Sequence, residues 1–191
     1  MDKVSKKIMI LEKAALLFSR KGFYGAGLNE LLTACDIPKG SFYYYFPQGK
    51  NQLAMEVLQM AYERMEGYII KNFETNPTAL SSFDHMVSGH IEILYRKKET
   101  YYYSLLLSLI GIESVFMDDQ RINDGVKNIY QRWQRLYQQK LLDCGYDDDQ
   151  ASQLAQVMFS VVHGTLISSW IKQDNEDLKK IKAYLPHILD K

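Results

Sequence analysis

The chain has 191 residues, of which 47% are hydrophobic and 24% charged, an ordinary globular composition that excludes an intrinsically disordered protein. Its eleven glycines and four prolines are too few turn-forming residues for a β-sandwich or barrel with many turns. The 23 basic and 23 acidic side chains cancel overall. However, residues 1–60 hold eight basic and five acidic side chains, a balance of +3, and residues 61–191 hold a balance of −3. Only the amino-terminal end is therefore suited to meet a polyanion.

The sequence predicts a reduced, cytoplasmic protein with no membrane partner. Its longest apolar stretches, 101–112 and 157–171, fall short of the roughly 20 residues that a membrane-spanning helix needs. The chain begins with a charged segment, not with an apolar signal segment. Cys35 and Cys144 lie far apart in the sequence and form no CxxC pair, as expected of a protein kept in a reducing compartment.

Helical periodicity runs through nearly the whole chain and predicts an all-α fold. Ser5 is the expected cap of the first helix and Gly22 its stop. The apolar face of this helix consists of Ile10, Ala14, Leu17 and Phe18. Two short helices follow, over about 28–34 and 39–46, and the segment Asp36-Ile37-Pro38 separates them.

Longer helices are predicted for the rest of the chain, and no stretch predicts a strand. In chain order they are a long helix over 50–72, a helix opened by Asn76-Pro77 and running to Tyr95, a very apolar helix over 100–115, an amphipathic helix over 118–144 closed by Gly145, a helix over 147–170 that starts with three aspartates, and a last helix capped by Asn175.

The two short helices, placed after a longer supporting helix, are the parts of a helix-turn-helix. The second one starts with Lys39-Gly40-Ser41, small or basic residues of the kind that reach base edges when a helix enters the major groove. The run Tyr43-Tyr44-Tyr45 spreads around this helix, so at least one hydroxyl is expected to face solvent or phosphate. The alternative is an ordinary aromatic helix in a bundle, where four aromatic residues in a row are hard to place on one face.

This segment resembles the TetR family of bacterial regulators. The resemblance covers about residues 5–58, and it is carried by Ile10-Leu11, Ala14, Leu17-Phe18, Gly22-Phe23, Leu28, Leu31-Leu32, Ile37, Lys39-Gly40-Ser41, Phe42-Tyr43, Phe46, Lys50 and Leu53. The loop Pro47-Gln48-Gly49 is longer than in most members and is similar to the LmrA/YxaF-like branch. The resemblance implies an amino-terminal helix-turn-helix DNA-binding domain over 4–64, with its reading unit at about 27–46. It also implies a carboxy-terminal helical bundle over 65–191 that binds an effector and dimerises.

The resemblance further implies a homodimer on a partly palindromic operator in double-stranded DNA. The two recognition helices must lie about 34–36 Å apart to enter successive major grooves. A small molecule that stabilises a different separation weakens operator binding. The residues expected at DNA are Lys39, Gly40, Ser41, Tyr43, Tyr44, Tyr45 and Lys50.

Three positions depart from the usual pattern of the family. Ala26 replaces a common phosphate-binding threonine, Gly27 replaces a hydroxyl-bearing helix cap, and Tyr45 replaces a frequent histidine. The side chains available as substitutes at phosphate are Tyr24, Tyr43, Tyr45 and Lys50.

The last two predicted helices are candidates for the dimer interface, because small residues recur at every fourth position and allow close helix packing. The expected interface consists of Ser160, Gly164, Ser168, Leu178, Ile181, Leu185 and Ile188. The alternative is a bundle that packs within one chain only.

Aromatic and soft side chains in the middle of the chain predict an apolar effector pocket, although each of them taken alone also suits core packing. The expected lining is Met86, His90, Leu106, Leu109, Glu113, Tyr130, Trp133, Tyr137, Phe159 and His163. Glu113 interrupts a very apolar helix, and is either a solvated end residue or a pocket residue that pairs with a cation or a hydrogen-bond donor. His90 and His163 suit core packing better than metal ligation, because neither has a partner at a metal-like spacing.

Together these patterns predict a DNA-binding transcriptional regulator, a homodimeric repressor released by a small apolar or aromatic ligand. Two alternatives stay open within this class, a DNA-binding dimer with no effector and an activator. An enzyme built on a helical bundle is the alternative from another class, but the sequence shows no catalytic set, and we expect no cofactor and no metal. Cys35 suits a buried thiol, and a redox role for it stays open.

Overall fold

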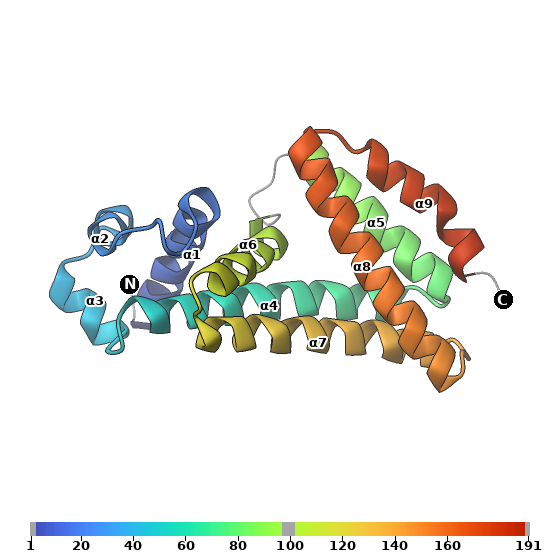
Figure 1. Ribbon diagram of the computed structural model, residues 1–191, viewed down its shortest axis with the longest axis horizontal. Helices are drawn as coiled ribbons and strands as arrows, with labels where there is room; N and C mark the ends of the chain where they lie inside the picture. Colours follow the sequence, from blue (N-terminus) through green and yellow to red (C-terminus); the bar gives the residue numbers. More distant parts are fainter. Residues whose placement is uncertain (1–2, 97–101, 190–191) are drawn as a thin grey trace. The chain divides into compact units, whose positions relative to one another are not determined.

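The computed structural model describes residues 3–96 and 102–189, and within these ranges it contains α-helices and no strand (Figure 1). The all-α fold class predicted from the periodicity is confirmed. The helices are α1 (Lys3–Lys21), α2 (Leu28–Cys35), α3 (Lys39–Tyr45), α4 (Lys50–Thr75), α5 (Ala79–Arg96), α6 (Tyr102–Phe116), α7 (Gln120–Asp143), α8 (Asp148–Lys172) and α9 (Glu176–Leu189).

Most helix ends fall where the sequence places them. Gly22 directly follows α1, and Gly145 lies two residues after the end of α7. Their φ angles of 74° and 84° are positive, a conformation that favours glycine and stops a helix. Asp147 caps α8, and its carboxylate accepts a hydrogen bond from the Gln150 N–H at 2.8 Å.

Two helix starts differ from the prediction. Ser5 lies inside α1, which already runs from Lys3. α5 begins at Ala79 and not at Asn76-Pro77, because the Thr78 hydroxyl accepts a hydrogen bond from the Ser81 N–H at 3.0 Å and acts as the cap. The first two residues of the predicted helix over 100–115 lie outside the described residues.

The chain packs as two units. The first unit consists of Met1–Met65 and Tyr102–Ile129, and the second of Glu66–Tyr101 and Tyr130–Lys191. The helices α4 and α7 therefore each supply residues to both units. The sequence placed 102–129 in the carboxy-terminal domain, whereas packing groups these residues with the amino-terminal helices.

The core of the first unit contains aromatic side chains from α1, from the loop after it and from the α3 segment. Phe18 and Phe23 pack edge to face with their ring centroids 5.4 Å apart, and both are buried. Phe42 and Phe46 of the α3 segment are buried as well, with ring centroids 5.5 Å apart. These contacts fix α3 to the unit through one of its faces.

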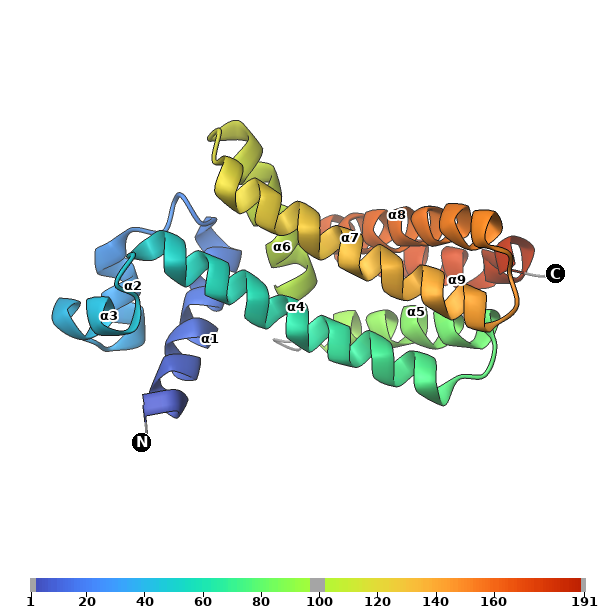
Figure 2. The same ribbon diagram turned by 90° about the horizontal axis from the view of Figure 1, so that it is seen from below.

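The second unit is a bundle in which α9 packs against α5 and α8 (Figures 1 and 2). Leu178, Leu185 and Leu189 of α9 are buried in it, as are Phe83 and Trp133. Because this packing lies within one chain, the apolar face of α9 belongs largely to the core.

The helix α8 is the one described helix that is long and apolar enough to cross a membrane, judged by length and composition only. About a third of its apolar stretch is buried inside the protein. Core helices of soluble proteins meet the same criterion, so the finding is weak support for a membrane span.

Candidate nucleic-acid interface and effector site

The turn between α2 and α3 is tight and built from three residues. Asp36 ends α2 in the left-handed conformation, at φ 52° and ψ 54°, which aspartate tolerates better than most residues. The Ile37 N–H donates to the Leu32 carbonyl oxygen at 3.1 Å and closes the helix end. Pro38 then starts α3 with φ −71°. This local geometry makes the predicted helix-turn-helix.

Glu30 compensates for the missing hydroxyl at the start of α2. Its carboxylate accepts a hydrogen bond from the Gly27 N–H at 3.2 Å and pairs with the Lys21 ammonium. The Lys21 hydrogen bond, followed by that of the Gly27 amide, lowers the pKa of Glu30. Helix α2 is therefore capped from its own first turn, where the negative charge also suits the helix dipole.

The helix α3 presents a polar outer face. Lys39 and Gly40 are exposed, and a Cβ atom added at Gly40 would meet no atom within 4 Å. Tyr43 and Tyr44 leave 42% and 62% of their surfaces exposed. A small first turn followed by exposed hydroxyls is what a helix needs to enter a major groove.

The remaining predicted DNA residues are less accessible. Ser41 and Tyr45 are half-buried, and the Tyr45 ring packs on Tyr44 at 5.2 Å. The Lys50 ammonium lies 4.4 Å from the centroid of the Phe23 ring. Burial lowers the pKa of Lys50, and the Glu113 charge opposes that shift. The phosphate contact of Lys50 stays a prediction, because its ammonium already has a partner.

Glu113 is bound to the loop that leads into the helix-turn-helix. Its Oε2 atom accepts a hydrogen bond from the Phe23 N–H at 2.7 Å. A Cβ atom added to Gly22 would lie only 1.9 Å from Glu113 Oε1, so this approach requires glycine. The sequence expected Glu113 either at a solvated helix end or in an effector pocket, and the structure instead gives it a main-chain donor in the first unit.

A second bond joins the same two segments. The Tyr24 hydroxyl donates to Asp119 Oδ2 at 2.9 Å. Burial, followed by this hydrogen bond, raises the pKa of Tyr24 to about 12. We call the four residues Phe23, Tyr24, Glu113 and Asp119 the clasp. Sequence reasoning missed it, because no local pattern relates residues that are 90 and 95 positions apart.

The second unit has an aromatic interior. The Phe159 and His163 rings stack at 4.2 Å, and Tyr130 lies 5.9 Å from Trp133. The expected effector residues found in this unit are Met86, His90, Tyr130, Trp133, Tyr137, Phe159 and His163, whereas Leu106, Leu109 and Glu113 belong to the first unit. The structure therefore divides the predicted lining between the two units.

Two histidines in this interior are held neutral. Burial lowers the pKa of His90 to about 4, and the neighbouring His163 contributes in the same direction. Burial, the largest cause, also lowers the pKa of His163 to about 4. Both ring nitrogens of His163 are buried without a hydrogen-bond partner, as is the Tyr68 hydroxyl. A bound polar molecule that forms a hydrogen bond with such a buried group gains binding free energy.

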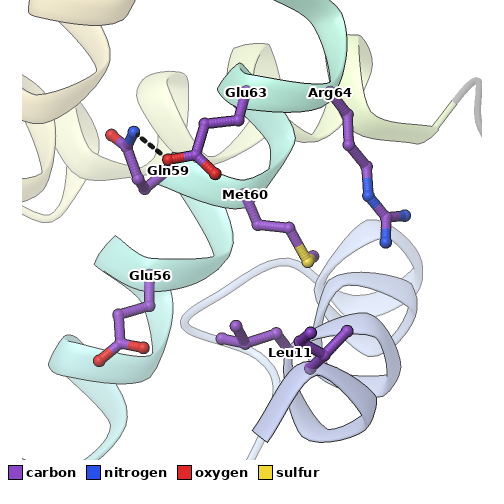
Figure 3. A pocket seen from close by; sticks show the side chains of 7 residues that line it. Leu11, Glu56, Gln59, Met60, Glu63 and Arg64 are labelled. Carbon is purple, nitrogen blue, oxygen red and sulfur yellow. Dashed lines mark hydrogen bonds between the residues drawn. The ribbon is translucent and has the colours of Figure 1, made fainter. Parts of the chain in front are cut away.

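A groove of about 510 Å³ lies on the first unit between α1 and α4 (Figure 3). None of the predicted effector residues lines it. Its lining consists of Ile8, Leu11, Glu56, Gln59, Met60, Glu63 and Arg64. In the described part of the chain, no three His, Cys, Asp or Glu side chains gather as a metal-ligand set.

The structure corrects part of the predicted dimer interface. Leu178 and Leu185 are fully buried against their own chain, because α9 covers α5 and α8, so the intrachain alternative holds for these two leucines. The other expected residues differ in accessibility: Ser160 and Gly164 are exposed, while Ser168, Ile181 and Ile188 are half-buried.

The outer face of α8 and α9 also carries exposed apolar residues that the sequence analysis did not single out. These are Val157, Ile171 and Tyr184, with 47%, 79% and 62% of their surfaces exposed. Val157 and Ile171 follow the spacing of Ser160, Gly164 and Ser168, so a helical count along α8 is the signal that places them on one face.

A tight two-helix turn, with an exposed small-residue start to its second helix, defines a helix-turn-helix DNA-binding protein. Residues 10–57 match the family model for bacterial regulatory proteins of the tetR family, and residues 79–184 match the model for the carboxy-terminal domain of LmrA/YxaF-like transcriptional regulators. The chain therefore belongs to the TetR family of DNA-binding transcriptional regulators, in its LmrA/YxaF-like group. Both the family and the regulatory function predicted from the sequence are confirmed.

Relatives cover nearly the whole chain. The transcriptional regulator LmrA of Bacillus subtilis is 27% identical over 183 residues, 94% of each chain, and YxaF of the same organism is 23% identical over 95% of this chain and 94% of its own. The reduced form of Escherichia coli NemR matches the fold with a TM-score of 0.80 at 20% identity, over 96% of this chain and 97% of its own. These relatives are transcriptional regulators, and regulators of this family bind DNA and effector ligands and act as dimers.

Proposed function

We propose that the protein is a cytoplasmic, homodimeric repressor that binds a partly palindromic operator in double-stranded DNA and is released by a small apolar or aromatic ligand. The observation that carries the proposal is the outer face of α3. Its inner side is anchored by Phe42 and Phe46, while Lys39, Gly40 and Tyr44 are exposed. A rigid, narrow helix with accessible small and basic groups is suited to read a major groove.

The DNA contacts divide by chemistry. Lys39, Gly40 and Ser41 form the first turn of α3, and Tyr44 lies in its last turn; all four are assigned to base edges. Tyr43, Tyr45 and Lys50 are assigned to phosphates, where a hydroxyl or ammonium contributes affinity without sequence preference. Of these, Tyr43 is the most accessible in the present conformation.

Dimerisation is assigned to the outer face of α8 and α9. Ser160 and Gly164 leave room for a close helix contact, and a Cβ atom added at Gly164 would meet no atom within 4 Å. Ile171 and Tyr184 supply exposed apolar surface for the partner. A symmetric pair of such faces forms a four-helix contact.

The effector is assigned to the interior of the second unit. Its aromatic walls favour an aromatic ligand, and the unpartnered His163 nitrogens favour one that donates a hydrogen bond. Since Glu113 is bound to Phe23, the interior offers no carboxylate from this residue to a cation. An uncharged aromatic ligand with a donor group therefore fits this interior better than a cationic one.

The test is selection of DNA from a random pool by the purified protein, followed by titration of a labelled selected duplex. We expect a palindromic sequence, bound with an affinity that falls steeply with salt. The regulatory proposal fails if no sequence is enriched. A ligand library is then screened by Trp133 and Trp170 fluorescence. If the ligands that bind do not release the duplex, the effector-less alternative is supported. If the protein activates transcription from the selected site, the activator alternative is supported.

A further inference from the structure

The end of α6 and the residue that follows it carry five exposed apolar side chains in nine residues. They are Leu109, Ile112, Val115, Phe116 and Met117, and we call them the α6 ridge. Phe116 leaves 83% of its surface exposed and Val115 leaves 65%. Together the five residues expose on the order of 500–600 Å², within the range of the largest apolar patch on a typical monomer. Water contact on this scale is costly unless another surface covers the ridge.

The same helix end is firmly held. Gly111 packs under Val126, where an added Cβ atom would lie 2.9 Å from Val126 Cγ1. The buried Ser114 hydroxyl accepts a hydrogen bond from Asn123 Nδ2 at 3.3 Å. Glu113 binds the Phe23 N–H through the clasp. The ridge therefore belongs to an anchored helix end and not to a frayed one.

We propose that a second copy of this chain covers the α6 ridge. The proposal rests on the homodimer proposed above and adds to the α8–α9 face a contact made by the unit that carries the helix-turn-helix. The area supports this occupant, because two ridges covered symmetrically remove on the order of 1,000–1,200 Å² from water, about the smallest area of a specific interface. The composition of the ridge also supports a second copy. All five side chains are uncharged, so a symmetric contact brings no like charges together.

The charges next to the ridge disfavour polyanionic occupants. Asp118 and Asp119 follow it directly, and acidic side chains repel the phosphates of nucleic acid and of anionic lipid. A membrane-binding segment instead combines apolar residues with lysine and arginine.

The position of the ridge has a consequence for operator binding. Because Glu113 holds the loop before α2, a partner that fixes the ridge also fixes the reading unit of the same chain. If both ridges are covered, two contacts fix the separation of the two recognition helices. One is the α8–α9 face, and the other is the ridge, which belongs to the DNA-binding unit itself.

The decisive experiment places one photo-crosslinking residue, p-benzoylphenylalanine, in the full chain without DNA. The position tested is Phe116. Tyr184 is the reference for the α8–α9 face, and Tyr44, equally exposed at 62%, is the control on the DNA face. We expect covalent dimers from positions 116 and 184 and none from position 44. Crosslinking at 184 but not at 116 overturns the ridge contact and leaves the proposed function intact, whereas a chain that sediments as a monomer overturns both.

A charge variant gives an independent readout. Phe116→Asp should raise the dimer dissociation constant about tenfold or more, as loss of an aromatic anchor does. The thermal midpoint of the monomer, measured at protein concentrations below the dissociation constant, should be unchanged because the side chain touches little of its own chain. An unchanged dissociation constant contradicts the ridge contact. Flotation with phosphatidylcholine–phosphatidylglycerol vesicles, abolished by the same variant, would overturn it in favour of a lipid surface.

Discussion

The Glu113 carboxylate of α6 accepts a hydrogen bond from the Phe23 N–H at 2.7 Å, although the two residues are 90 positions apart. The bond lies directly beside Gly22, whose positive φ of 74° ends α1. It joins the loop before the helix-turn-helix to the α6–α7 corner. The apolar helix that was expected to line a ligand site thus supports the reading unit.

Gly22→Ala should lower the free energy of unfolding by about 1–3 kcal/mol, because it adds a Cβ atom both at positive φ and against Glu113. Gly40→Ala is the matched control, since space is open there and the residue is helical. That control should leave stability unchanged or raise it slightly while weakening operator binding. Urea unfolding of both variants decides the matter, and equal stabilities would contradict the clasp geometry.

Glu113→Leu should cost about 1–3 kcal/mol, because it leaves the Phe23 N–H without its acceptor. Glu113→Gln keeps an acceptor oxygen and should cost less. Neither change should discriminate cationic from neutral ligands of the same shape, in contrast to what a pocket carboxylate would do. A selective loss of cation binding in Glu113→Gln, measured by Trp fluorescence titration, would return this residue to the effector site.

The reading unit can be tested by salt dependence. Lys50→Ala should weaken binding to all sequences and lower the slope of log K against log salt by about one, as loss of one phosphate contact does. Lys39→Ala and Ser41→Ala should change base preference instead. If the slope is unchanged in Lys50→Ala, the ammonium stays on the Phe23 ring in the complex and its role is to support the loop.

His90 and His163, whose rings lie in the interior of the second unit, predict a loss of stability in mild acid. Their pKa values are lowered to about 4 in the folded state, so below pH about 6.5 the unfolded chain binds protons that the folded chain does not. Stability should therefore be full above pH 7 and fall as the pH drops from about 6.5 toward 4, by up to roughly 3 kcal/mol per histidine. Urea titrations at several pH values should show a flatter dependence in the His90→Phe, His163→Phe double variant. Replacing the exposed His85 by Gln should change nothing, and a slope that persists in the double variant would assign the effect to other groups.

Assembly and folding should separate in the carboxy-terminal helices. Leu185→Ala removes a fully buried side chain and should cost about 2–5 kcal/mol of stability. Ile171→Asp changes a side chain that is 79% exposed, so it should weaken the dimer and leave the monomer fold intact. Sedimentation combined with thermal unfolding distinguishes the two, and a stable Leu185→Ala monomer would contradict the core assignment.

The helix-turn-helix and the helical fold class followed from the sequence alone, because local rules determine them. Apolar periodicity marks each helix, and backbone preferences at Gly22 and Pro38 set their ends. The exposed start at Lys39-Gly40-Ser41 was likewise readable, since its residue types and spacing are local.

The partners of individual faces were decided only by the tertiary structure. Periodicity shows that α9 has an apolar face but not what covers it, so Leu178 and Leu185 were placed at an interface and lie in the core. The single carboxylate in α6 was equally ambiguous, because its donor at Phe23 comes from a distant part of the chain. Non-local contacts depend on how helices pack against one another, and packing depends on the shapes of all the side chains together.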